Sequence, residues 1–257
     1  MSQSDWAYLS NDLIYVALAL YALSFLSYTY ETAFSLRANK ISGDKHLDRS
    51  ITTKSRKVAS IVFLLATASL TLAVIARGIS AERIPLGNMY EYSITGAMTF
   101  ALAYLIIGLK FDLSWLGLPS SILILLILGT AITLLYRPSA PLVPALQSSW
   151  LVIHVSSAIL SGGIFLLSNT VAGAYLWLDR IERKGVRGEF AKRFPSLESL
   201  DQLSYRLVAF VFPLWTFAVI SGAIWAEAAW GRYWGWDPKE TWAFITWILY
   251  ASYLHAR

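Results

Sequence analysis

Seven apolar segments, each near the length of a bilayer-spanning helix, constrain this chain more than any other feature. A spanning helix needs about 20 predominantly apolar residues. The segments are Leu13–Phe34, Val58–Ala76, Ile94–Leu109, Pro119–Tyr136, Trp150–Leu178, Leu207–Ala226 and Thr241–Arg257. The chain is 56% hydrophobic and 14% charged, whereas soluble domains have about 45–50% apolar and 25% charged residues. The sequence therefore predicts an all-α polytopic membrane protein with about seven transmembrane helices, and it excludes a soluble cytosolic enzyme.

The cysteine count and the N-terminal residues exclude further classes. The chain has no cysteine, which rules out disulfides, thiolate metal sites and cysteine nucleophiles on this chain. The first apolar segment follows Asp5 and Asp12 and has no small-residue cleavage site. A secretory signal begins with basic residues instead, so we expect this segment to be a retained spanning helix.

The distribution of Lys and Arg predicts how the chain lies in the membrane. Most of them lie in residues 35–57 and 180–206, which the segment order puts on the same side of the membrane. That side carries 16 basic residues and the opposite side carries 5. Basic residues collect on the cytoplasmic side, so the N-terminus is predicted to lie outside. Topology thus explains the net charge of +5, and a nucleic-acid partner is not expected.

The outward loop between the sixth and seventh segments is unusually aromatic. Residues 230–241 read Trp-Gly-Arg-Tyr-Trp-Gly-Trp-Asp-Pro-Lys-Glu-Thr. One or two tryptophans would be an interfacial belt, but Trp230, Trp234 and Trp236 stand within seven residues. The glycines Gly231 and Gly235 let the backbone approach a flat object closely. We interpret the loop as a platform for a large planar ligand.

The end of this loop predicts a helix start. Asp237 suits the N-cap position and Pro238 the first helical position. The platform would then be held rigidly at the beginning of the seventh helix.

The three histidines have different interpretations. His46 lies in the basic first loop, and we assign it no role. His154 lies near the outer end of the fifth segment, one turn from Trp150 and beside small residues that would also suit close helix packing. An ionisable group inside a span is a functional candidate, and the residues alone leave both readings open. His255 closes the seventh segment, where a solvated histidine at the cytoplasmic edge is the alternative.

Several motifs together resemble a known family. These are the tryptophan-rich run, Ile-Pro-Leu-Gly-Asn-Met-Tyr-Glu-Tyr at 84–92, Trp-Leu-Val-Ile-His-Val-Ser at 150–156 and Tyr-Leu-His-Ala-Arg at 253–257. The tryptophan run is similar to the haem-handling membrane proteins of cytochrome c biogenesis. The flanking motifs resemble the CcsA/ResC branch, the membrane subunit of the two-component System II cytochrome c synthase. The resemblance covers residues 84–257 as a haem-handling core, and residues 1–83 form a two-helix region with a basic loop that fits more loosely.

The resemblance implies ligands and partners. Haem b would be both substrate and ligand, with His154 and His255 as axial ligands of haem iron. The partners would be a CcsB/ResB-like membrane subunit, apocytochrome c and the lipid bilayer. Lyase activity would need the partner subunit, and attachment would occur on the extracytoplasmic face of a bacterial plasma membrane, with the thylakoid membrane as the alternative.

Depth adds a constraint that does not depend on the resemblance: the 14 residues from Thr241 to His255, at 1.5 Å each, put His255 about 21 Å below the outer surface, whereas His154 lies near that surface. The two histidines therefore cannot ligate one iron, and two haem positions, or one path with an entry and an exit, are implied.

Further expectations follow from the resemblance. Arg232 and Lys239 are candidate propionate contacts, with interfacial solvation as the alternative. The family continues to a further outward loop with another histidine, so we expect this chain to be truncated after Arg257.

Two rival functions remain at this point. The first is a haem transport or delivery subunit without attachment activity. The second is a non-haem structural subunit of a membrane complex, which would be colourless and would tolerate replacement of His154.

Overall fold

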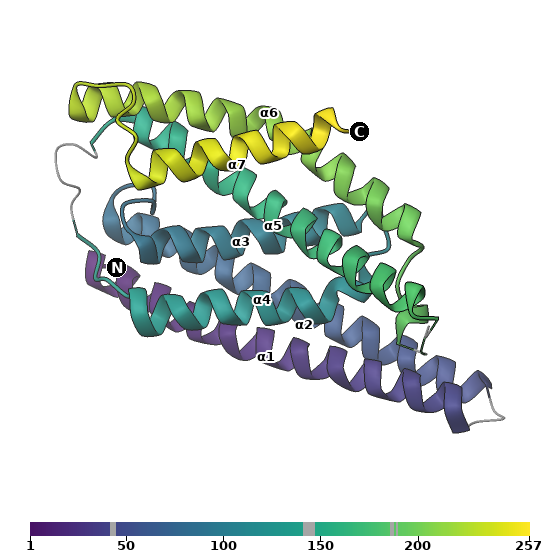
Figure 1. Cartoon of the computed structure of the whole chain (residues 1–257). Coiled ribbons are helices and arrows are strands. Elements are labelled where there is room, and N and C mark those ends of the chain that lie inside the picture. Colours follow the sequence, from purple (N-terminus) through teal and green to yellow (C-terminus); the bar gives the residue numbers. More distant parts are fainter. Residues whose placement is uncertain (42–44, 141–146, 186–187, 189) are drawn as a thin grey trace.

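The computed structural model describes residues 1–41, 45–140, 147–185, 188 and 190–257, and it does not describe the side chains of 35–52. His46, Arg37, Lys40, Lys45, Arg49 and Arg187 therefore have side chains outside the description. Throughout the described ranges the regular elements are helical, which confirms the all-α prediction (Figure 1). They are α1 (Gln3–Ile41), α2 (Lys45–Ala81), α3 (Met89–Gly108), η1 (Ser114–Leu116), α4 (Gly117–Thr130), η2 (Ala131–Leu135), α5 (Ser149–Arg183), η4 (Ala191–Arg193), α6 (Leu197–Trp230) and α7 (Pro238–His255).

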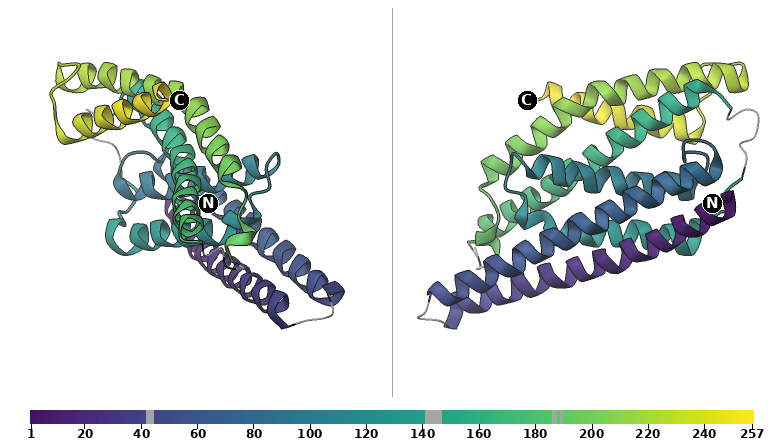
Figure 2. Two further views of the ribbon diagram at one scale, coloured as in Figure 1. Left: turned by 45° about the vertical axis from the view of Figure 1, so that its right-hand side comes forward. Right: turned by 180° about the vertical axis from the view of Figure 1, so that it is seen from behind.

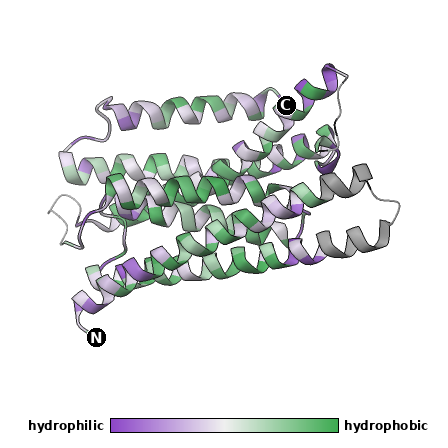
Figure 3. Cartoon of the chain, turned by 90° about the horizontal axis from the view of Figure 1, so that it is seen from below, coloured by the Kyte–Doolittle hydropathy of each residue, from purple (hydrophilic) through white to green (hydrophobic). Residues whose placement is uncertain are grey.

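Within the described residues, six helical stretches are long and apolar enough to cross a membrane, and they comprise α1, α2, α3, η1 to η2, α5 and α6. The seventh predicted segment also forms a helix, the 18-residue α7. It is not among the six, because Lys239 and Glu240 in its first turn and further polar side chains along its 18 residues leave no sufficiently apolar stretch of spanning length. Figure 3 shows hydrophobic residues concentrated in the middle of the helices and hydrophilic ones toward their ends.

The helices run back and forth between two ends of the bundle (Figures 1 and 2). The loops at 82–88 and 231–237 lie at one end, which we call the tryptophan end. The turn at 109–113, residues 190–196 and the C-terminus lie at the other, which we call the basic end. The sequence prediction that these loops alternate between two sides is confirmed.

The main core lies among α1 to α5 and extends to η4 and the first half of α6. Its fully buried side chains include Tyr21, Phe63, Ile94 and Phe100. Hydroxyl groups in this apolar setting need partners. The Tyr21 hydroxyl lies 2.9 Å from the Thr67 hydroxyl, and the Ser10 hydroxyl donates to the Ala73 carbonyl at 2.8 Å. These bonds fasten α1 along α2.

A buried carboxylate organises the 82–88 loop. Glu91 in the first turn of α3 accepts from Arg77 Nε at 3.1 Å, from Arg83 Nη1 at 2.7 Å and from the Gly87 N–H at 2.8 Å. In the structure Asn88 caps the start of α3 by accepting from the Glu91 N–H at 2.9 Å. These contacts make the loop part of the scaffold.

Helices α5, α6 and α7 form the second half of the molecule. α5 packs against both α3 and α6, whereas α7 lies along α6 (Figure 2). Gly163 on α5 makes the contact with α3 possible, because a Cβ there would lie 2.7 Å from the Thr99 methyl carbon. The α5–α6 pair carries the candidate site.

Candidate functional site

The tryptophan loop is a closed turn built around the Glu240 carboxylate. Helix α6 ends at Gly231, which adopts the left-handed conformation (φ +69°) and donates its N–H to the Glu227 carbonyl. Helix α7 then begins with a capping box: Asp237 accepts from the Glu240 N–H at 2.9 Å, and Glu240 accepts from the Asp237 N–H at 3.3 Å. The predicted N-cap at Asp237 and the proline at N1 are confirmed.

The same carboxylate also holds Arg232 and Gly235. Glu240 accepts from the Gly235 N–H at 2.7 Å and from Arg232 Nη1 at 3.2 Å. The Arg232 guanidinium lies over Gly235 so closely that a side chain there would collide with it. The local structure therefore explains why glycine occupies both position 231 and position 235. Arg232, predicted to meet a propionate, is engaged by Glu240, but it stays partly exposed.

The motif tryptophans divide into two groups. Trp234 and Trp236 meet edge to face with ring centroids 5.7 Å apart, and each meets Phe244 of α7 edge-on. Trp236 is 66% exposed and holds an unusual backbone φ of +57°. A non-glycine residue in this region is strained, and such strain is typical of functional sites. The local fold thus keeps a large aromatic face in the open.

The aromatic row continues down α7. Phe244 stacks on Trp247 at an interplanar angle of 4°, and the Trp247 indole N–H donates to the Thr216 hydroxyl at 2.9 Å. Further along, Tyr250 stacks on Phe165 of α5 with centroids 3.9 Å apart. Rings therefore line the contacts of α7 with α5 and α6.

Trp230 belongs to the second group, which leads to His154. Trp230 is 56% exposed and meets Trp225 edge to face with centroids 6.1 Å apart. Trp225 in turn lies parallel to the His154 ring, with centroids again 6.1 Å apart and an interplanar angle of 6°. A histidine of α5 is thereby joined to the tryptophan loop through one turn of α6.

The orientation of His154 is fixed by the α6 backbone. Its Nδ1 lies 2.8 Å from the Ala218 carbonyl oxygen. Since a carbonyl can only accept, Nδ1 carries a proton and donates it, and in the neutral ring the lone pair is therefore on Nε2. Gly222 makes this approach possible, because a Cβ there would lie 2.7 Å from both Nδ1 and Cε1 of His154.

This arrangement fits an axial ligand of a haem iron. A metal-binding histidine usually donates its second ring N–H to a carbonyl or carboxylate, which fixes the tautomer and aims the other nitrogen. Among the described residues no three His, Cys, Asp or Glu side chains gather as a chelating group.

The second predicted ligand lies at the opposite end of the bundle. His255 is the last residue of α7 and is exposed. The next turn is anchored by Arg257, which pairs with Asp201 of α6 and lies over the Tyr205 ring at 5.1 Å. The 18 residues of α7 span about 27 Å. The structure brings His154 near the tryptophan loop and keeps His255 away from it.

Sequence reasoning missed three residues that place His154: Ala218, Gly222 and Trp225. One signal was available, because Ala218, Gly222 and Ala226 recur at every fourth position of α6. Small residues at this spacing permit close helix contact. The pattern predicts a close neighbour for α6, although it does not say that the neighbour is a histidine.

Comparisons with known proteins assign the family. A family model described as "Cytochrome C assembly protein" matches residues 86–257. The chain belongs to this family. It is similar to the "Cytochrome c biogenesis protein CcsA" of Guillardia theta, with 39% identity over 214 residues that cover 76% of this chain and 70% of the relative.

Two further relatives carry the same description. The protein of Porphyra purpurea is 33% identical over 239 residues, covering 78% of this chain and 75% of the relative. The protein of Chlorella vulgaris is 38% identical over 219 residues, which cover 73% of this chain and 70% of the relative. The resemblance noted in the sequence is confirmed, and the chain is a multi-pass membrane protein of cytochrome c biogenesis.

Proposed function

We propose that this cytochrome c assembly protein binds haem b at the tryptophan end and presents it for attachment to apocytochrome c. The observation that carries the proposal is the hydrogen bond between His154 Nδ1 and the Ala218 carbonyl. It leaves Nε2 as the free nitrogen of an imidazole whose orientation is fixed by Gly222. An axial ligand needs this tautomer and this preorganisation.

The tryptophan loop would hold the macrocycle. Trp230, Trp234 and Trp236 supply apolar faces, of which Trp230 and Trp236 are more than half exposed. Asp237, Gly231 and Gly235 fix the loop that carries them. Cationic side chains bind carboxylates by charge-assisted hydrogen bonds, and Arg232 and Lys239 would meet the haem propionates in this way. The glutamate that holds Arg232 would keep its guanidinium at the edge of the platform.

Haem supplies the two vinyl groups that form thioether bonds with the cysteine thiols of apocytochrome c. The residues of this chain would hold the macrocycle, fix its iron and limit water around it, while the thiols come from the protein substrate. A chain without cysteine is compatible with this division of roles. Attachment would require a CcsB/ResB-like partner subunit, as the CcsA/ResC resemblance implies.

A second haem position would involve His255. It lies at the basic end, about 27 Å along α7 from the tryptophan loop, and its exposed side chain would need a further ligand from outside the described residues. Haem would then be held first at the basic end and later at the tryptophan end. By the positive-inside rule this path leads from the cytoplasmic to the extracytoplasmic face. We place the protein in a bacterial plasma membrane, with the thylakoid membrane as the alternative.

The test is covalent haem attachment in cells that lack their own cytochrome c synthase. The chain, with any natural continuation beyond Arg257, is co-expressed with a CcsB/ResB-like subunit and an apocytochrome c, and haem stain on denaturing gels reports attachment. We expect His154→Ala to abolish the stained cytochrome, whereas replacement of the exposed Tyr8 by Phe leaves it unchanged. Full attachment by His154→Ala would reject the proposal. Haem bound by the chain without any attachment would favour the delivery function instead.

A further inference from the structure

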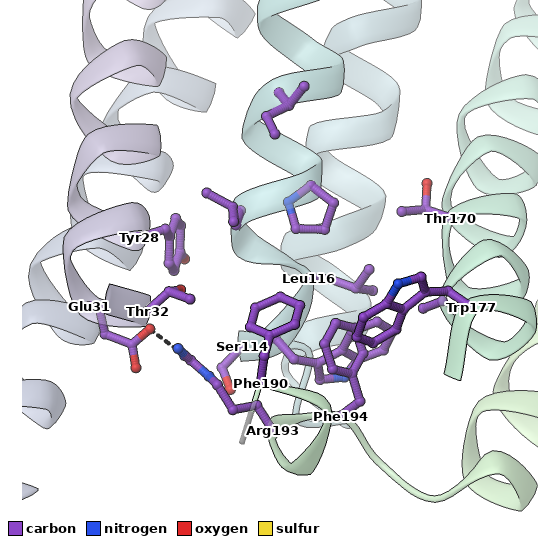
Figure 4. Close-up of a pocket in the computed structure, with 15 residues that line it drawn as sticks. Tyr28, Glu31, Thr32, Ser114, Leu116, Thr170, Trp177, Phe190, Arg193 and Phe194 are labelled. Atoms are coloured by element: carbon purple, nitrogen blue, oxygen red, sulfur yellow. Dashed lines mark hydrogen bonds and ion pairs between the residues drawn. The ribbon is translucent and has the colours of Figure 1, made fainter. Parts of the chain in front are cut away.

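A cavity of about 260 Å³ lies at the basic end, between α1, α4, α5 and the turn that contains η4 (Figure 4). Its walls are mainly apolar and aromatic: Trp115, Leu116, Trp177, Phe190 and Phe194 contribute to them. Its lining includes no residue of the tryptophan loop and neither His154 nor His255. It is therefore separate from the proposed haem site.

The cavity opens toward the lipid-facing side of the bundle. Ile122 of α4 and Trp177 of α5 line it and are 40% and 39% exposed. The two helices flank the space without close packing between them, since α5 makes its main contacts with α3 and α6. In a membrane the apolar edge between α4 and α5 faces acyl chains.

One polar corner interrupts the apolar wall. Glu31 of α1 is 1% exposed, and it accepts from Arg56 Nη2 at 3.0 Å and from Arg193 of η4. Figure 4 shows the Arg193 side chain reaching Glu31 at the edge of the cavity. Arg56 also donates to the Ser114 hydroxyl at 3.3 Å. Two guanidinium groups from distant parts of the chain thus converge on one carboxylate.

Two buried donors near this corner have no acceptor among the described residues. They are the Trp115 indole N–H, whose ring lines the cavity, and the Arg56 Nε–H. Leaving a buried donor without a partner costs about 1–3 kcal/mol, so native structures usually supply an acceptor. An oxygen-rich anionic group in the cavity would give the Trp115 donor an acceptor and would lie beside the Arg193 guanidinium, which also lines the cavity. Arg56 does not line it and contributes its charge through the shared Glu31 carboxylate.

We propose that this cavity binds one anionic phospholipid. An acyl chain would lie between α4 and α5 against Trp177 and Ile122. The phosphate would accept hydrogen bonds from Arg193 and from the Trp115 indole N–H, which both belong to residues that line the cavity. Phosphate oxygens form strong charge-assisted bonds with guanidinium groups, and basic residues at the cytoplasmic interface attract anionic headgroups. The bound lipid would bridge α1, α4, α5 and η4.

The experiment is native mass spectrometry of the intact protein after release from nanodiscs. The nanodiscs contain phosphatidylcholine with an equal fraction of phosphatidylglycerol. We expect one phosphatidylglycerol to stay bound per chain, at least tenfold more often than phosphatidylcholine. Ala174→Trp, which fills the cavity from α5, should reduce retention at least tenfold. Leu176→Trp is the matched control, because Leu176 is exposed on the same helix and does not line the cavity.

A second variant protects the test against a folding defect. Trp115→Phe removes the indole N–H and keeps an aromatic ring, and we expect it to lower phosphatidylglycerol retention at least threefold with an unchanged elution volume. Equal retention of the two lipids, or unchanged retention in both cavity variants, would overturn the proposal. Displacement of the lipid by millimolar inorganic phosphate would also overturn it, since a free anion would then be the preferred ligand. Haem in this cavity, detected as loss of haem absorbance in Ala174→Trp alone, would overturn it as well.

Discussion

Helices α1 to α4 and helix α7 are held in place by different kinds of contact. The first four share a core with fully buried rings such as Tyr21 and Phe100. They also enclose the Glu91 carboxylate with Arg77. Helix α7 has no buried residue. Ring contacts and single hydrogen bonds such as that of Trp247 with Thr216 fasten it. The first region is a scaffold, and the second leaves aromatic surface available to a ligand.

This difference predicts that changes in the scaffold alter folding stability and that changes around α7 alter haem binding. The largest expected effect comes from Glu91→Ala. It leaves Arg77, whose side chain is 1% exposed, without its carboxylate, and breaking a buried ion pair in this way costs about 3–5 kcal/mol. Chemical unfolding in detergent measures the loss. Glu227→Ala, which removes an exposed carboxylate, is the control and should leave stability unchanged. A Glu91→Ala protein as stable as the control would remove the distinction between the regions.

The second effect concerns the binding site itself. Gly222→Ala puts a methyl group where the His154 ring lies, so the imidazole must move and its bond to Ala218 must weaken. We expect haem affinity to fall about tenfold, which corresponds to about 1.4 kcal/mol, with little change in unfolding. Titration with haem followed by absorbance measures the affinity. Gly162→Ala on α5 is the control, because nothing lies within 4 Å of the added carbon. Equal affinities in the two variants would show that the Gly222 contact does not position His154.

A smaller effect is expected in the tryptophan loop. Glu240→Ala removes the capping box and the acceptor of the Gly235 N–H, and loss of a helix cap costs about 1 kcal/mol. Amide hydrogens of residues 233–241 should exchange about fivefold faster, while those of α1 to α4 keep their rates. Hydrogen exchange with mass spectrometry resolves the two regions. Uniform acceleration across the chain would mean that α7 is part of the same cooperative unit as the scaffold.

The smallest effect is expected for Lys239→Ala. An exposed charge pair contributes about 0.2–1 kcal/mol, so the lost propionate contact should weaken haem binding by at most about fivefold. The dependence of affinity on salt should decrease as well, because one screened charge interaction is gone. Lys110→Ala at the basic end is the matched control. Identical affinity and salt dependence in both variants would assign Lys239 to interfacial solvation.

The sequence predicted the fold well because apolar segment length and basic-loop alternation are strong signals in membrane proteins. It also located the Asp237 cap, since capping depends on neighbouring residues only. The boundaries were less accurate, because α1, α2 and α6 continue as helices beyond their apolar segments. A hydropathy pattern marks where lipid surrounds the chain and does not mark where the helical backbone ends.

The binding site was only partly predictable. His154 could be singled out as an ionisable residue in a span, but its bond to Ala218 joins residues 64 positions apart, and no local pattern encodes that contact. The engagement of Arg232 by Glu240 was also missed. The sequence interpretation considered only which ligand the loop would bind. In the structure Glu240 accepts hydrogen bonds from Arg232 and from backbone N–H groups of the turn.

The visible spectrum of the purified protein titrated with haem tests the central claim most directly. Wild type is compared with His154→Ala, without and with added imidazole, and with His255→Ala. We predict that His154→Ala loses the absorbance of histidine-ligated haem at the tryptophan end and that imidazole restores it. His255→Ala should instead reduce the absorbance of haem bound at the basic end. Identical spectra and affinities for wild type and His154→Ala would contradict ligation of haem by His154.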